Sequence, residues 1–165
     1  VSSFGGRTIQ QETADVGRHT TGVTEFRVAI DPQNVGVLLR RKLDQRSPNQ
    51  RALVEIAGDD PGSPWVRAGV WSTPGSDEVV YSKPPDEMGG PSSSLETSNR
   101  RWREDEFLIA RALTEGRAAI RVRITFMPRN LPLLPGQPVP EQAWSEYRYW
   151  AYSWRFPAVG GRREF

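Results

Sequence analysis

The chain has 165 residues, with 22 lysines and arginines against 20 aspartates and glutamates and a formal net charge of +2. This length corresponds to one domain, and the nearly balanced charge argues against binding to a nucleic-acid backbone. The composition is that of an ordinary folded protein, and no stretch approaches the roughly 18 apolar residues of a membrane span. We therefore expect neither a disordered chain nor a nucleic-acid or membrane partner.

Short segments that alternate between apolar and polar residues predict strands along most of the chain. The clearest is 118–126, where Ile120, Val122 and Ile124 alternate with Arg121 and Arg123. Only residues 109–115 have a helix-favouring composition, which predicts a single turn. The sequence therefore predicts an all-β protein with about eight strands. In chain order these cover residues 25–30, 35–43, 51–57, 65–71, 78–81, 106–110, 118–126 and 144–156.

Two long connections rich in proline, glycine or serine interrupt this pattern, at residues 82–99 and 127–143. Loops of this length in a compact domain are usually functional or disordered. Neither is expected to be a domain boundary, because the strands on both sides are needed to complete a sheet. We expect one β-sandwich domain over residues 1–165, with a core at about 23–156 and a loose tail at 157–165.

Several motifs recur in an order that resembles a known family. They are LLRRKLDQ at 38–45, NQRALVEIAG at 49–58, GVW at 69–71, NRRWREDEFLIARALTEGRAAIRVRI at 99–124 and WSEYRYWAYSW at 144–154. Over about residues 26–154 the chain is similar to the jelly-roll glycoside hydrolases of a former unknown-function family, which act on difructose dianhydrides and arabinofuranosides. The resemblance implies a jelly-roll-like antiparallel β-sandwich, a role linked to sugars, and assembly as an oligomer.

Aromatic residues are the strongest functional signal, and the last predicted strand concentrates them. A flat ring beside arginine or carboxylate groups suits a sugar, because the ring covers the C–H face while the charged groups form hydrogen bonds. Packing in the sandwich core is the competing interpretation. On one face of the last strand, a two-residue period places Trp150, Tyr152, Trp154 and Phe156. The residues predicted to bind a ligand are Trp71, Tyr81, Arg101, Trp102, Trp144 and Tyr147.

Carboxylates offer a second candidate site. Glycoside hydrolysis needs two carboxyl groups about 5–10 Å apart, and Glu104 with Glu146 is the predicted catalytic pair. A pair formed by Asp44 and Glu55 is the other possibility. Because Arg103 and other arginines lie beside Glu104 in the sequence, surface ion pairs are the competing interpretation.

Metal and cofactor sites have little support in the sequence. The chain has no cysteine and a single histidine, His19, and it contains no glycine-rich phosphate loop. We expect no cofactor, although Asp59, Asp60 and Asp77 leave a structural calcium ion open.

Three functions follow from these observations. The leading hypothesis is a carbohydrate-binding or accessory module, secreted or extracellular, whose partners are a glycan or oligosaccharide and either further copies of the chain or other domains of a larger protein. The first alternative is a glycoside hydrolase acting on furanosides. The second is a structural subunit of a jelly-roll oligomer, in which the aromatic strand makes subunit contacts.

Overall fold

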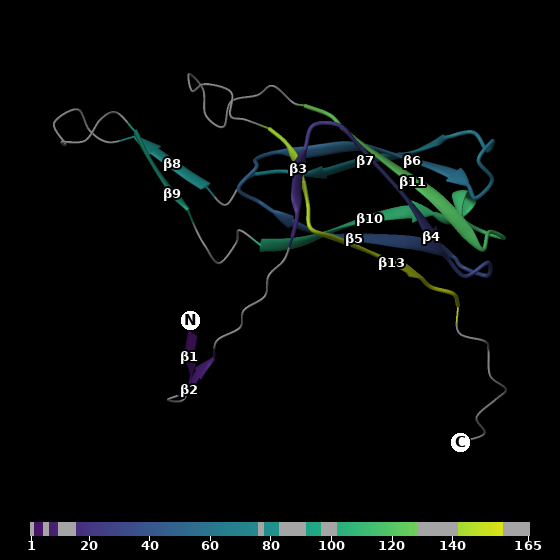
Figure 1. Ribbon diagram of the computed structural model, residues 1–165, viewed down its shortest axis with the longest axis horizontal. Helices are drawn as coiled ribbons and strands as arrows, with labels where there is room; N and C mark the ends of the chain where they lie inside the picture. Colours follow the sequence, from purple (N-terminus) through teal and green to yellow (C-terminus); the bar gives the residue numbers. More distant parts are fainter. Residues whose placement is uncertain are drawn as a thin grey trace.

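The computed structural model describes residues 2–4, 7–9, 16–75, 78–82, 92–96, 102–128 and 142–156. Two antiparallel sheets lie face to face as the layers of a sandwich (Figure 1). The first sheet has the strand order β4 (Val23–Ala29), β11 (Ala119–Phe126), β6 (Gln50–Gly58) and β7 (Val66–Thr73). The second has the order β10 (Trp102–Ala110), β5 (Gly36–Asp44) and β13 (Arg148–Ser153).

Shorter elements complete the described part of the chain. A 3₁₀ turn, η1 (Arg111–Leu113), connects β10 to β11. Three further antiparallel pairs are β3 (Arg18–Thr20) with β12 (Trp144–Glu146), β1 (Ser2–Phe4) with β2 (Arg7–Ile9), and β8 (Glu78–Ser82) with β9 (Ser92–Glu96).

The strand pairs of the sandwich are nested around one hairpin. At the centre, β6 pairs with β7, which follows it directly in the sandwich. Outward from this hairpin, β5 pairs with β10 in the second sheet, β4 with β11 in the first, and β3 with β12 in a two-stranded sheet of their own. This is the connectivity of a long hairpin rolled into two sheets, which defines a jelly roll.

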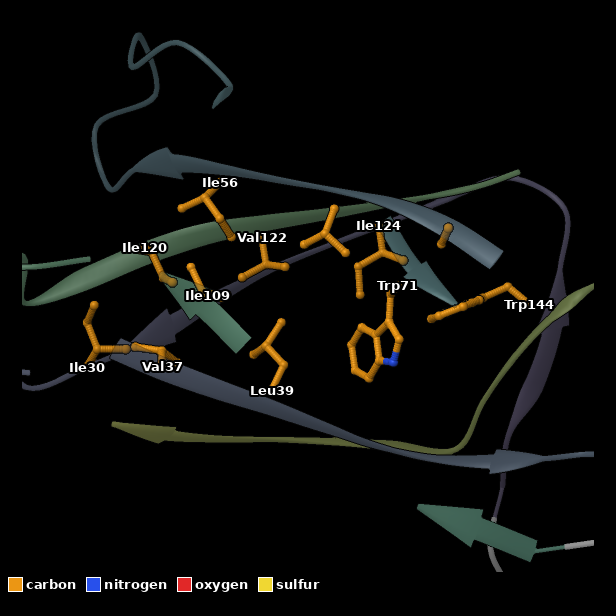
Figure 2. Close-up of a cluster of buried hydrophobic side chains, with 12 residues drawn as sticks. Ile30, Val37, Leu39, Ile56, Trp71, Ile109, Ile120, Val122, Ile124 and Trp144 are labelled. Atoms are coloured by element: carbon orange, nitrogen blue, oxygen red, sulfur yellow. The ribbon is translucent and has the colours of Figure 1, made fainter. Parts of the chain in front are cut away.

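The core lies between the sheets and follows directly from strand alternation. Inward residues of the first sheet, such as Ile56, Val122 and Ile124, meet Val37 and Leu39 of the second (Figure 2). All five side chains are almost completely shielded from solvent. Alternating positions on the same strands point outward, so each sheet has one dry face and one face available for function.

One end of the core contains a buried cation. The guanidinium of Arg41 has no exposed side-chain surface and donates to both carboxylate oxygens of Asp105, at 3.0 and 2.6 Å. It also lies 3.4 Å from the ring centroid of Trp144 and donates to the Gln50 side chain. A buried charge with this many partners is stabilised by them, whereas removing one partner would leave an uncompensated charge.

The all-β sandwich predicted from the sequence is confirmed, with several changes at strand ends. Strand β10 begins at Trp102, four residues before the predicted start, and the last predicted strand is interrupted at Tyr147. The predicted loop at 82–99 contains β9, and β3 was not predicted at all. The predicted tail at 157–165 lies outside the described residues. Within the described part, no helix is long and apolar enough to cross a membrane.

Candidate functional site

The outer faces of the two sheets differ in character. On the first sheet, Arg123 lies between two carboxylates, 2.6 Å from Glu25 and 3.9 Å from Glu55, and its guanidinium lies 3.9 Å from the Trp65 ring centroid. Such a face, covered by ion pairs between neighbouring strands, is typical of a solvated surface. The described residues of this face include no exposed aromatic row.

The outer face of the second sheet combines aromatic, aliphatic and charged side chains. Its central strand β5 buries alternate residues, so the intervening Leu38, Arg40 and Lys42 point outward. The strand register then defines three rows across the sheet, each running from β10 through β5 to β13. The rows are Leu108–Leu38–Tyr152, Glu106–Arg40–Trp150 and Glu104–Lys42–Arg148. We call these nine residues the outer aromatic face.

Arg40 organises the centre of the outer aromatic face. Its guanidinium donates to Glu106 Oε1 through Nε at 2.9 Å and Nη2 at 2.5 Å, and Nη1 lies 3.4 Å from Glu104 Oε2. The hydrogen bond to Glu106 raises the pKa of Arg40. The same guanidinium lies 5.2 Å from the ring centroid of Tyr152, whose exposed fraction is 43%. A forked cation, carboxylates and a ring are thus held within one patch.

A second aromatic pair lies beyond the last row. Trp102 is half exposed and packs edge-on against Tyr147, with ring centroids 5.0 Å apart and an interplanar angle of 84°. In the strand register Trp102 lies two residues from Glu104, so it continues the outward side of β10. Of the residues predicted to bind a ligand, these two are the pair that the structure brings together near this surface.

Two other predicted ligand-binding residues lie in the core. Trp71 and Trp144 are 2% and 1% exposed, and their rings meet edge to face at a centroid distance of 5.6 Å. Both contact the buried Arg41 guanidinium. Their rings have no face available to a ligand, so the structure assigns them to packing. Arg101 and the side chain of Tyr81 lie outside the described residues.

The two predicted catalytic carboxylates are not brought together. Glu104 is on the outer aromatic face beside Arg40, whereas Glu146 is buried and accepts hydrogen bonds from Arg18, Thr24 and Tyr149. The strands that carry them, β10 and β12, belong to different sheets, and Glu104 lies on an outer face whereas Glu146 is buried. Asp44 and Glu55 likewise belong to different sheets.

The loop that carries Asp59 and Asp60 is organised by an arginine of the chain itself. Nε of Arg121 donates to the carbonyl of Gly58 at 3.0 Å, and its Nη2 donates to the carbonyls of Asp60, Pro61 and Ser63 at 2.9–3.3 Å. Asp59 accepts two hydrogen bonds from Arg27, and these lower the pKa of the Asp59 carboxyl. The described residues contain no cluster of three or more potential metal-ligating side chains.

Sequence reasoning found part of the outer aromatic face and missed the rest. The two-residue period correctly placed Trp150 and Tyr152 on one face of the last strand. It gave no role to Arg40 or Glu106, although the alternation of β5 was visible in the sequence. What was missing is the strand register, because only the pairing of β5 with both β10 and β13 brings these residues together.

Comparison with known proteins adds no further assignment. No family model matches the chain, and neither the curated proteins nor the solved structures gave a match.

Proposed function

We propose that the protein is a carbohydrate-binding or accessory module that binds a glycan chain on its outer aromatic face. The observation that carries this proposal is the placement of Trp150 and Tyr152 beside the Arg40–Glu106 ion pair on one sheet face. An aromatic ring buries the apolar side of a sugar, while arginine and carboxylate groups form directional hydrogen bonds with its hydroxyls. Both kinds of group are present within the three rows.

The dimensions of the face support an extended ligand. The rows follow one another at two-residue steps, so the distance from the Leu108 row to Trp102 is about 20 Å along the strands. Tyr152 lies at one end of this distance and Trp102 at the other, and between them lie Trp150, Arg40, Lys42 and the two glutamates. This arrangement fits an oligosaccharide that contacts a ring near each end and charged groups in the middle.

A structural subunit remains the competing function for the same face. The buried centre of a protein interface is depleted of charged residues. The middle row of the outer aromatic face instead contains Arg40 and Glu106, which form an ion pair, and the next row contains Lys42 and Glu104. This charge distribution favours a hydroxyl-rich ligand over a dry subunit contact.

The proposal is tested by glycan binding to matched variants. A glycan array first identifies the ligand, and isothermal titration calorimetry then measures Kd for the wild type and for Trp150→Ala and Tyr152→Ala. We expect each variant to raise Kd about tenfold, corresponding to a loss of about 1.4 kcal/mol, because each removes one stacking ring.

The matched control is Trp65→Ala, which removes an aromatic ring from the outer face of the other sheet and should leave Kd unchanged. If Trp150→Ala and Tyr152→Ala bind every glycan with the same Kd as the wild type and the control, the proposal is contradicted. A wild-type protein that binds no glycan but sediments as a defined oligomer would favour the structural subunit.

A further inference from the structure

Strand β3 covers only part of the edge formed by β12 and β13. Strand β3 pairs with β12 over three residues and its register ends where Arg18 meets Glu146. Strand β13 continues this side of the second sheet for six more residues, Arg148–Ser153, and pairs with β5 on its other side. Among the described residues, no strand pairs with the side of β13 that faces away from β5.

Two cavities follow this unpaired edge. The larger, about 520 Å³, is lined by residues of β3, β4 and β12–β13, including Arg18, Phe26 and Arg148. The smaller, about 350 Å³, lies between β4 and β13. Both are lined by Phe26 and Tyr149, whose rings are 5.0 Å apart. The two cavities share these residues at the edges of the two sheets, and we call them together the edge groove.

The backbone of β13 presents hydrogen-bonding groups to the edge groove. Trp154 O accepts a hydrogen bond from Val35 N at 2.8 Å, so this carbonyl faces the β5 side. Backbone groups alternate in direction along a strand. The N–H and C=O groups of Tyr149 and Ala151 therefore face the edge groove, in the orientation that an added strand requires.

We propose that the edge groove binds an extended peptide strand of a partner protein, in which apolar residues alternate with acidic ones. Added to β13, the strand would place its inward side chains against the rings of Phe26 and Tyr149, which favours apolar residues there. Its outward side chains would lie beside the exposed Arg148, which favours carboxylates. This is the addition of a strand to an open sheet edge, with main-chain hydrogen bonds supplying affinity.

The charge along the edge groove supports the same partner. Besides Arg148, the lining contains Arg18, whose side chain is 58% exposed. Glu146, the carboxylate of the larger cavity, is 7% exposed and already accepts hydrogen bonds from Arg18, Thr24 and Tyr149. Arg18 and Glu146 form an ion pair, so the charge of Arg148 leaves the lining of this cavity net positive, which complements an acidic strand.

A second copy of the chain fits this position less well. Strand β4 forms the edge of the first sheet, and the contact between Phe26 and Tyr149 brings it over the β13 edge. A twofold pairing of β13 with its own copy would bring the copy's β4 into the space of the first sheet. A single peptide strand carries no such second layer.

Fluorescence anisotropy with two labelled eight-residue peptides tests the proposal. One peptide alternates valine with glutamate and the other alternates valine with lysine. We expect the wild type to bind the glutamate peptide at least tenfold more tightly, and Arg148→Glu to reverse that order. Ala151→Pro should abolish binding, because it removes an N–H that faces the edge groove while proline is tolerated on an edge strand.

The matched control is Arg103→Glu, a charge reversal at an exposed position of β10, which should keep the wild-type order of the two peptide affinities.

Hydrogen exchange of the Tyr149 and Ala151 amides should be fast in the free protein and at least tenfold slower with the glutamate peptide. Failure of both peptides to bind, or an unchanged order in Arg148→Glu, would overturn the proposal. Amides already protected in the free monomer or in a dimer would also overturn it, because the edge would then be occupied by this chain. Glycan binding is measured on separate variants, so either proposal can fail alone.

Discussion

At the scale of single residues, Tyr149 joins the core to the polar end of the sandwich. Its hydroxyl donates to Glu146 Oε2 at 2.8 Å and accepts from Trp144 Nε1 at 2.8 Å. Its ring packs on Phe26 and Trp71. Burial raises the pKa of Tyr149 far above its ordinary value, and the negative charge of Glu146 raises it further. The phenol is therefore held in its neutral form.

This raised pKa predicts a loss of stability at high pH. Below the ordinary tyrosine pKa of about 10 the phenol is neutral in both states and its stabilising contribution is complete. As pH rises above that value the unfolded state releases the proton first, so the free energy of unfolding falls. Between pH 8 and pH 11, the free energy of unfolding measured with urea should fall less in Tyr149→Phe than in the wild type. Tyr152→Phe, at an exposed position, is the control; equal losses in all three proteins would contradict the prediction.

At the scale of elements, a glycine adapts β7 to the sheet. The register between β6 and β7 shifts between Val54 and Glu55, opposite Gly69, which has a φ of +155°. A Cβ atom at Gly69 would lie 3.1 Å from Cζ of Phe107, a residue of the facing sheet. Glycine thus serves both the backbone conformation and the close approach of the two layers.

Gly69→Ala should therefore lower the free energy of unfolding by about 1–3 kcal/mol, since both the backbone and the Phe107 contact are strained. The measurement is urea unfolding followed by circular dichroism. Gly62→Ala is the matched control, because a Cβ there meets no atom within 4 Å. A Gly69→Ala protein as stable as the control would contradict the prediction, because the backbone at the register shift would then accept a side chain at no cost in free energy.

Strand alternation explains why much of the fold was predictable from the sequence. Segments such as β11, with one apolar and one charged side, were located almost to the residue. The early part of β10 was missed because Trp102 to Asp105 lacks that alternation: Asp105 points inward, where its charge is neutralised by Arg41. An acidic residue that is largely buried against a partner distant in the sequence has no local sequence signal. The core position of Trp144 was also not predicted, because its ring packs against the guanidinium of Arg41, a residue distant in the sequence.

At the scale of the whole molecule, the nested strand pairing requires contacts between distant parts of the chain to form during folding. Apart from the β6–β7 hairpin, each pair in the sandwich joins strands far apart in the sequence, and β3 with β12 spans nearly the whole described chain. Closing such long loops costs entropy before the contacts form. The fold therefore depends on contacts that no local segment supplies.

We expect slow folding as a result. All-β domains dominated by distant pairings fold in about milliseconds to seconds, whereas domains with local contacts fold faster. Stopped-flow refolding from urea, followed by tryptophan fluorescence, reports on the burial of Trp71 and Trp144. A relaxation completed in microseconds would show that the core forms from local structure.

The loop after β6 illustrates what a covalently attached cation provides. Arg121 binds the carbonyls of Gly58 and Asp60 through a charge that belongs to the polypeptide. An inorganic ion in such a place can dissociate, be exchanged for a competitor or be removed by a chelator. A guanidinium that belongs to the chain can do none of these. The carbonyls of Gly58 and Asp60 in this turn thus have a partner that a change in the mineral content of the medium does not remove.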